Sequence, residues 1–245
     1  STARPMLEVR GLRTMAHPRH SVNFTIGAGE ILGMAGLVGA GRTEVLEVLF
    51  GIEPALDGEV LIDGALQEIE NPRDAIRSGL ALVPEDRKQQ GVILEMAVRE
   101  NLSLAALRRD ARGGFLVRGR ERDIADEMVT KLNVKTPSQR QLVQYLSGGN
   151  QQKIALGRWL ALNPRVLLLD EPTRGIDVGA KEEIYRLMEQ LAASGMAILF
   201  VSSEMEEILR MSDRALVMHE GRITGELHRG QLSEEAVMQL ATGRQ

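Results

Sequence analysis

The sequence contains no cysteine, and only 3% of its 245 residues are aromatic. The lack of cysteine excludes a disulfide scaffold and a thiolate metal site, and it is consistent with a reducing compartment. No run of about 18 apolar residues occurs, so we expect no segment that spans a bilayer. The formal net charge of -4 lacks the basic excess typical of nucleic-acid binding, and we therefore expect no nucleic-acid partner.

The remaining composition is that of an ordinary globular protein, with 43% hydrophobic and 26% charged residues. A chain of this length can form one large α/β domain, or a domain with a subdomain. Its first residues, STARPMLEVR, show no charged-then-apolar signal layout and no initiator Met. We therefore expect the chain to be an excised part of a longer protein.

Short β-type runs recur along the chain, and several are almost entirely apolar, as in strands buried on both faces. The expected strands are Leu7–Val9, Val22–Ile26, Ile31–Ala35, Glu59–Ile62, Leu80–Pro84, Val166–Asp170, Ala197–Ser202, Ala215–His219 and Arg222–Leu227. Helical patterns separate the later runs, at Gly149–Asn163, Gly179–Ser194 and Glu204–Met211. This alternation predicts a mostly parallel sheet with helical crossovers. The earlier runs lie closer together and carry glycine-rich turns, which predicts an antiparallel β layer beside the parallel core.

Residues 97–144 have a different pattern, with helical stretches and polar breaks. We expect them to form a helical subdomain inserted into a core made of residues 1–96 and 145–245. Near the end of the chain, Ser233–Leu240 is predicted to be a helix, with Ser233 as its N-cap and two acids in its first turn.

A glycine-rich segment follows the expected strand Ile31–Ala35 and opens an expected helix, Glu44–Phe50. It has the pattern G-x-x-x-x-G-K-[ST] of a phosphate-binding loop, except that Arg42 stands in the place of Lys. Its glycines let backbone N–H groups surround an anion, and the helix N-terminus adds partial positive charge. The alternative is a glycine-rich turn that binds nothing. The candidate ATP-binding residues are Gly36, Leu37, Val38, Gly39, Ala40, Gly41, Arg42, Thr43 and Glu44.

Two adjacent acids, Asp170 and Glu171, end the apolar run Val166–Asp170. A buried strand directs its last side chains into the crevice where α/β folds bind ligands. Asp170 can reach Mg²⁺ there, together with the Thr43 hydroxyl, and Glu171 can orient or deprotonate a water at a γ-phosphate. The alternative is an acidic strand end capped by a turn.

A third motif, LSGGNQQ, contains the candidate residues Ser147, Gly148, Gly149, Asn150 and Gln151. It resembles the LSGGQ signature of ATP-binding cassette ATPases, and it lies about 20 residues before the LLLDEP strand. More narrowly, the chain resembles the C-terminal cassette of ribose/galactose/xylose-type sugar-import ATPases, through the strings GLVGAGRTE, EDRKQQG, LSGGNQQK, DEPTRGIDVGAK and FVSSEMEE. The resemblance covers nearly the whole chain. It implies a P-loop NTPase fold of the ABC type over residues 1–245.

The resemblance also implies the function. ATP and Mg²⁺ would be the ligands, and the chain would be one half of a two-cassette ATPase that drives sugar import. The partners would be an N-terminal cassette on the same polypeptide, transmembrane permease subunits and, indirectly, a periplasmic sugar-binding protein. The location would be the cytoplasmic face of the bacterial inner membrane. The signature residues would act in trans on the other cassette's nucleotide, and Asp177 would belong to the loop called the D-loop.

Three positions depart from the family pattern. Arg42 replaces Lys, Glu85 replaces the Gln of the segment called the Q-loop, and Ser203 replaces the switch His. Serine carries no positive charge and cannot act as imidazole does. By alignment, Ser203 and Glu171 are the candidate catalytic residues, and Glu85 joins Thr43 and Asp170 as a candidate metal ligand. We therefore expect this chain's own nucleotide site to be degenerate and slow.

Two further features have competing interpretations. The aromatic residue expected to stack on adenine is absent, and His20 can replace it or be a surface residue beside His17. The run Glu85, Asp86, Arg87, Lys88 is either the permease contact that the family places here or a solvated charge run.

Two other functions compete with transport. One is a non-transport cassette ATPase of DNA repair or translation. Repair types carry long coiled arms, for which the roughly 100 residues between Thr43 and Ser147 leave no room, and translation types carry basic linkers or arms, of which the sequence shows none. A nucleotide-binding regulatory module without turnover is the other alternative, and the retained Glu171 argues against it.

Overall fold

The computed structural model describes residues 5–110 and 118–243. The chain divides into two compact units. The core unit comprises Ser1–Leu82, Arg165–Glu171 and Met188–Gln245, and the helical unit comprises Val83–Pro164 and Pro172–Leu187. Residues 111–117, within the segment predicted to form the helical subdomain, lie outside the described residues.

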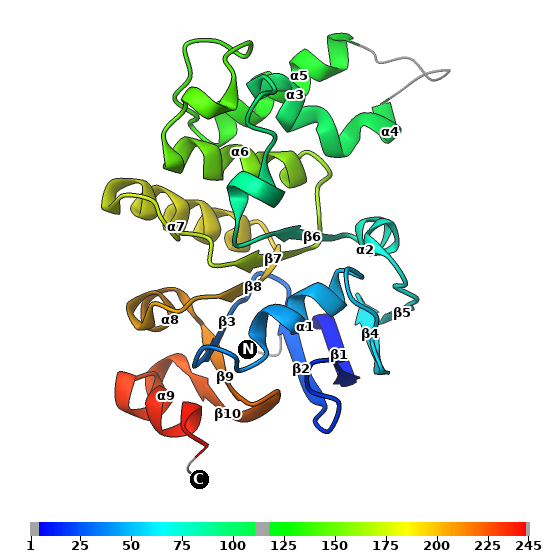
Figure 1. Ribbon diagram of the computed structural model, residues 1–245, viewed down its shortest axis with the longest axis vertical. Coiled ribbons are helices and arrows are strands. Elements are labelled where there is room, and N and C mark those ends of the chain that lie inside the picture. The colour runs from blue at the N-terminus through cyan, green and yellow to red at the C-terminus, as the bar shows by residue number, and fades with distance from the viewer. Residues whose placement is uncertain (1–4, 111–117, 244–245) are drawn as a thin grey trace. The chain divides into compact units, whose positions relative to one another are not determined.

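The larger sheet has six strands in the order β10-β9-β3-β8-β7-β6 (Figure 1). Its strands are β3 (Ile31–Gly36), β6 (Leu80–Val83), β7 (Val166–Asp170), β8 (Ala197–Val201), β9 (Arg214–His219) and β10 (Arg222–His228). The pairs β3–β8, β3–β9 and β7–β8 are parallel, and β9–β10 is an antiparallel hairpin. Every residue of β7 and β8 is buried, which explains why both sequences are apolar runs without alternation.

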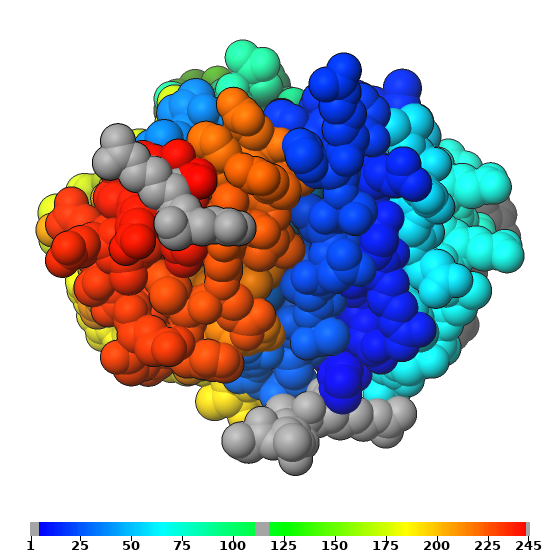
Figure 2. All heavy atoms as spheres, turned by 90° about the horizontal axis from the view of Figure 1, so that it is seen from below, coloured from blue at the N-terminus to red at the C-terminus, as the bar shows by residue number. Residues whose placement is uncertain are grey.

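The smaller sheet is antiparallel, in the order β2-β1-β4-β5. Its strands are β1 (Pro5–Arg13), β2 (Val22–Gly27), β4 (Asp57–Ile62) and β5 (Ala65–Gln67). Figure 2 shows the face of the core unit on which the orange segment that includes β10 adjoins the blue segment of β1 and β2, with the cyan segment of β4 and β5 beyond it; the contact of β10 is with β2. The core unit therefore contains the parallel sheet and the antiparallel β layer that the sequence predicts.

Several α-helices of the described residues lie wholly in the core unit. They are α1 (Arg42–Leu49), α2 (Pro72–Ser78), α8 (Met205–Met211) and α9 (Glu234–Ala241). Helix α1 contacts β3 and β7, α8 contacts β3, and α9 contacts β9 and β3. Ser233 is the N-cap of α9 and accepts a hydrogen bond from Ala236 N at 3.2 Å, as predicted.

The helical unit contains a π-helical turn, Arg87–Gly91, and the helices α3 (Val98–Ser103), α4 (Leu107–Asp110), α5 (Arg118–Lys131) and α6 (Gly148–Leu160). Helix α3 packs against α5 and α6. A buried pair ties α3 to α6, because Arg158 donates to the carbonyl and the side-chain oxygen of Asn101 at 3.2 and 2.6 Å. Helix α7 (Val178–Ala193) starts in this unit and ends in the core unit. Within the described residues, none of the helices is both long and apolar enough to cross a membrane.

Candidate functional site

The predicted phosphate loop connects the buried strand β3 to the first turn of α1. Gly39 and Gly41 adopt φ angles of +80° and +96°, in the left-handed region that glycine tolerates best. The loop tip, residues 37–39, is exposed, whereas Gly41 and Arg42 are buried. The first backbone N–H groups of α1 have no partners inside the helix, so they are available to an anion seated in the loop.

Arg42 is nine-tenths buried, and its side chain does not project into solvent. Its guanidinium donates a hydrogen bond to the carbonyl oxygen of Ser202 at 2.9 Å. This contact is possible because α1 follows β3, Ser202 follows β8, and β3 and β8 are paired neighbours. Burial lowers the pKa of Arg42, while the nearby carboxylates of Glu171, Asp170 and Glu44 raise it. The positive charge of the loop, Arg42, is thus hydrogen-bonded to the carbonyl of Ser202, the residue before the switch position Ser203.

Asp170 lies at the end of β7 and is 4% exposed. Burial raises the pKa of its carboxyl to about 6, although a hydrogen bond from the Thr43 side chain and the charge of Arg42 oppose the shift. One of its oxygens, Oδ1, is buried and has no hydrogen-bond partner. The side chains of Thr43 and Asp170 are therefore hydrogen-bonded to each other, and Oδ1 of Asp170 remains available to a further ligand.

This arrangement fits Mg²⁺, which is commonly held by one or two protein oxygens together with phosphate oxygens and waters. The partnerless Oδ1 and the Thr43 hydroxyl beside it are hard oxygen donors of the required kind. Among the described residues, no cluster of three or more His, Cys, Asp or Glu side chains forms a dedicated cation cage. A metal at this position would thus be a cation bound together with phosphate.

Glu171 directly follows Asp170, the last residue of β7, and has an unusual backbone conformation. Its φ angle is +47°, and its N–H donates to Val201 O at 3.0 Å. The Ser203 hydroxyl donates to Glu171 Oε2 at 3.1 Å. The two candidate catalytic residues are therefore hydrogen-bonded to each other, and the carboxylate of Glu171 is held at the edge of the site by a strained backbone.

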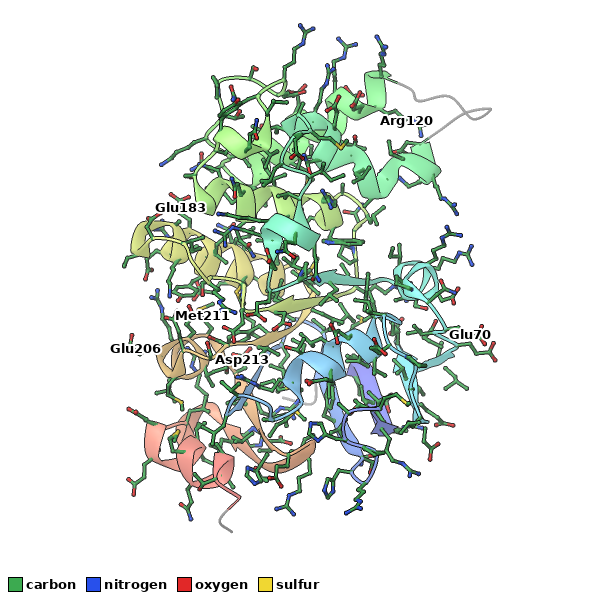
Figure 3. All side chains as sticks on the ribbon, in the orientation of Figure 1. Glu70, Arg120, Glu183, Glu206, Met211 and Asp213 are labelled. Carbon is green, nitrogen blue, oxygen red and sulfur yellow. The ribbon has the colours of Figure 1, made fainter. Side chains whose placement is uncertain are left out.

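Ser202 and Glu207 belong to the same network, and the sequence analysis did not identify them. The Ser202 hydroxyl donates to Glu207 Oε2 at 2.6 Å and accepts from Glu204 N at 3.0 Å. Glu207 is buried, whereas its neighbour Glu206 extends outward from α8 (Figure 3). Ser202 thus links two elements of the site. Its carbonyl oxygen accepts from Arg42, and its hydroxyl donates to Glu207, a buried acid of α8.

The candidate adenine contact is clearer in the structure than in the sequence. His17, rather than His20, lies against the phosphate loop, since a Cβ added to Gly41 would be 2.8 Å from His17 Cδ2. The same imidazole would collide with any side chain at Gly221. His20 is exposed.

In the helical unit, the run Glu85 to Lys88 adjoins Arg174 and the first residue of the D-loop, Gly175. Arg87 donates to the carbonyls of Arg174 and Gly175 at 2.6 and 3.0 Å, and Glu85 forms an ion pair with Arg174. The metal role predicted for Glu85 remains a prediction. A hollow of about 330 Å³ is lined by Glu85, Asp86, Arg87, Lys88, Arg174 and Gly175.

The signature motif also lies in the helical unit, where Ser147 is the N-cap of α6. Gly149 is needed for close packing, because a Cβ at this position would collide with Ala180 at the start of α7. Gln151 is buried and donates to Val143 O and Leu146 O, so it supports the motif instead of facing a ligand. Asp177 Oδ1 accepts from Ala180 N at 3.0 Å and closes the first turn of α7.

A glycine loop between a buried strand and a helix, with Thr43 and a buried aspartate beside it, defines the class of the core unit as a P-loop nucleotide-binding fold. The chain belongs to the ABC transporter family, because the family model described as ABC transporter matches residues 19–174.

Curated relatives are similar over most of this chain. The ribose import ATP-binding protein RbsA of Yersinia pestis is 51% identical over 223 residues, which cover 91% of this chain and 44% of the relative. A putative ribose/galactose/methyl galactoside import ATP-binding protein of Pseudomonas fluorescens is 52% identical over 238 residues, covering 97% of this chain and 46% of the relative. This chain therefore spans about half the length of the curated relatives it matches.

Solved structures share the fold. The ADP conformation of an ATP-binding cassette of an ABC transporter aligns with a TM-score of 0.80 at 20% identity, covering 98% of this chain and 99% of the other. A dimeric bacterial ABC transporter cassette aligns with a TM-score of 0.76 at 23% identity, covering 91% of this chain and 99% of the other. The α/β P-loop fold of the ABC type that the sequence predicts is thus confirmed.

Proposed function

We propose that this chain is a nucleotide-binding half of a two-cassette ATPase that couples ATP binding and hydrolysis to sugar import. The observation that carries the proposal is the network in the core unit, where the phosphate loop, Asp170 and the Glu171–Ser203 pair converge. Sequence identity of about 50% to proteins named for ribose import supports the substrate class. The half-length match to those relatives leaves room for a second cassette on the same polypeptide. Its N-terminal position rests on the resemblance of this chain to C-terminal cassettes.

The residues of the core unit have distinct roles in this function. Backbone N–H groups of the loop and of α1 would hold the phosphates, while Thr43 and Asp170 would hold Mg²⁺, which supplies charge neutralisation when bound. Glu171 would orient the attacking water and accept its proton. The Ser203 hydroxyl would keep that carboxylate in place but would donate no positive charge to the γ-phosphate. With Arg42 bonded to Ser202, this set of groups is suited to slow turnover.

The signature residues have a separate role. In a head-to-tail pair of cassettes, Ser147, Gly148 and Gly149 would serve the nucleotide held by the other cassette, with Asn150 and Gln151 supporting them. The three departures from the family pattern, Arg42, Glu85 and Ser203, would then all lie in one composite site. Ser147 would belong to the other composite site.

The partners follow from the same assignment. The hollow lined by Glu85 to Lys88 would receive a segment of a transmembrane permease at the cytoplasmic face of the bacterial inner membrane, and a periplasmic sugar-binding protein would act through that permease. Lys88 is exposed and suits a cysteine-based cross-linker. A cross-link from Lys88→Cys to the permease in the assembled importer is the expected result. Free labelling of that cysteine in the complex, with no cross-link, would count against the contact.

Nucleotide binding by this chain can be tested directly. We expect Gly41→Val to abolish Mg-ATP binding, because a side chain there would collide with His17 and would strain the left-handed backbone. Gly119→Ala is the matched control, since open space surrounds that position. Binding measured with a fluorescent ATP analogue decides the question: an unchanged Kd for Gly41→Val would exclude the phosphate loop as the site.

A further inference from the structure

Asn150 occupies the third position of α6, and its side-chain amide has two partners at the start of that helix. Its Oδ1 accepts from the backbone N–H of Lys135 at 2.8 Å, and its Nδ2 donates to Ser147 Oγ at 2.9 Å. The N–H of Lys135 can only donate, so it fixes which end of the amide carries oxygen. Nδ2, a donor, must therefore face Ser147.

The hydrogen bonds around Ser147 Oγ determine where its proton points. A serine hydroxyl has two acceptor lone pairs and one proton to donate. Its oxygen accepts from Asn150 Nδ2 and, at 3.4 Å, from the Asn150 backbone N–H. Both neighbours are donors, so the Ser147 proton is directed away from them, and Ser147 is an exposed residue.

We propose that Asn150 is a positioning residue that commits the Ser147 hydroxyl to act as a hydrogen-bond donor toward a phosphate oxygen. The proposal rests on the role given above to Ser147 in the other cassette's site. It adds an explanation of why residue 150 is an asparagine, whose amide can donate to the serine. Asn150 does not touch the phosphate itself. It acts by occupying the acceptor side of the serine before nucleotide arrives, which removes the reorientation that a free hydroxyl would need.

The variant Asn150→Asp replaces the donor that faces Ser147 by an acceptor while the side chain keeps nearly the same shape. Its Oδ1 can still accept from Lys135 N–H, but the second oxygen is an acceptor that faces Ser147 and takes the serine proton for itself. A carboxylate in the first turn of a helix is otherwise favourable, because it complements the helix dipole. The positioning role therefore predicts that Asn150→Asp loses turnover without losing stability, whereas a merely structural role predicts that any loss of turnover follows a loss of stability.

The experiment uses the full-length protein with its permease and compares Asn150→Asp, Asn150→Leu and Ser147→Ala. Asn163→Asp, the same change just beyond the other end of α6, is the matched control. We expect Asn150→Asp to lower ATP turnover as much as Ser147→Ala does, on the order of a hundredfold. Asn150→Leu, which removes the donor without adding charge, should lower turnover about tenfold, an intermediate loss on the same scale. The thermal midpoint of Asn150→Asp should not fall, and Asn163→Asp should keep normal turnover.

Each other outcome is informative. Normal turnover in Asn150→Leu with loss only in Asn150→Asp would overturn the proposal, because it points to charge repulsion. Parallel loss of stability and turnover in Asn150→Asp would overturn it in favour of a structural role. If Ser147→Ala is itself fully active, the proposed role of the signature fails instead. In that case the Asn150 side-chain NH₂ resonance in NMR still tests the geometry, since it should shift when Ser147 becomes Ala, and no shift would refute the contact.

Discussion

Arg42 differs from the usual loop lysine in shape more than in charge. A guanidinium is a broad planar fork that can satisfy several acceptors, whereas an ammonium is a compact point charge. The bond from Arg42 to Ser202 O uses this fork to tie α1 to the segment after β8. A phosphate that needs this cation would have to compete with a buried carbonyl and with the charges of Glu171 and Asp170.

The first prediction concerns this competition. Arg42→Lys should tighten Mg-ATP binding to the isolated chain by about tenfold, or ~1.4 kcal/mol, because the shorter ammonium releases Ser202 O and remains beneath the phosphates. Arg42→Met, which keeps the bulk but has no charge, is the control and should bind more weakly than the natural chain. Titration calorimetry gives both values. Weaker binding by Arg42→Lys than by the natural chain would show that Arg42 itself holds the phosphates.

The second prediction concerns the buried carboxyl of Asp170, whose pKa is raised to about 6. A raised folded-state pKa means that the folded protein holds this proton more tightly than the unfolded chain does. The free energy of unfolding therefore falls as pH rises from about 4 to about 6 and stays lower above that range. Asp170→Asn should remove this dependence and raise stability at pH 7 by a few kcal/mol, at about 1.4 kcal/mol per pKa unit.

The same variant should lose Mg²⁺-dependent nucleotide binding, because the amide is a poor ligand for a hard cation. Urea unfolding at pH 4 to 8 tests the stability, with Asp123→Asn on the exposed part of α5 as control. Equal stability of Asp170→Asn and the natural chain at pH 7 would contradict the burial argument.

At the scale of elements, the strands of the parallel sheet were predictable where they are buried on both faces. Strand β7 has the predicted bounds, because its apolar residues form one continuous run that charged residues flank on both sides. Strand β5 and helix α2 were missed. Strand β5 is three residues long and largely exposed, and α2 has only one buried residue. Asn71 followed by Pro72 was the available signal for α2, since this Asn caps the helix and Pro occupies its first turn.

The site was predictable only in part, for a physical reason. The loop and the paired acids are local patterns, whose residues are adjacent in the sequence. The Arg42–Ser202 bond joins residues 160 positions apart and depends on the order of strands in the sheet. Similarly, the sequence places Asn150 in the signature motif but does not show that its side chain faces Ser147 and Lys135.

The third prediction concerns the buried tie between α3 and α6. Burial lowers the pKa of Arg158 to about 10, so it remains charged at pH 7, and Asn101 accepts two of its hydrogen bonds. Asn101→Ala should cost about 3 kcal/mol or more, because it leaves a buried charge without its side-chain acceptor. Arg158→Met should cost less, since it removes the charge and keeps much of the volume. Urea midpoints of the two variants decide the order, and a larger loss for Arg158→Met would contradict it.

At the scale of the whole molecule, the proposed function implies that this chain's residues serve two different active sites. The core unit holds Glu171, Ser203 and Arg42 in one hydrogen-bonded neighbourhood, whereas Ser147 lies in the helical unit. If two cassettes associate head to tail, the core-unit residues act on this chain's own nucleotide and Ser147 acts on the other. The isolated chain should then hydrolyse ATP slowly, and steady-state phosphate release at many turnovers per second would refute the degenerate assignment.

The fourth prediction follows from this division and is made for the full-length protein. Ser147→Ala should reduce ATP turnover on the order of a hundredfold, because it removes a preorganised donor from the site that works. Glu171→Gln should cost much less, because on the proposed assignment the site it serves would already be slow without a lysine and a histidine. Glu171→Gln is nearly isosteric, and neither residue lies in the hydrophobic core. Ser147→Ala removes the N-cap of α6 at a cost of about 1 kcal/mol, so the thermal midpoint of each variant is measured beside its activity. The measurement is steady-state ATPase activity in the assembled transporter, with Mg-ATP binding to each variant as the control for the phosphate loop. The opposite order, in which Glu171→Gln abolishes turnover while Ser147→Ala remains near normal, would mean that this chain's own phosphate loop is the working site and that Arg42 and Ser203 have replaced lysine and histidine without loss.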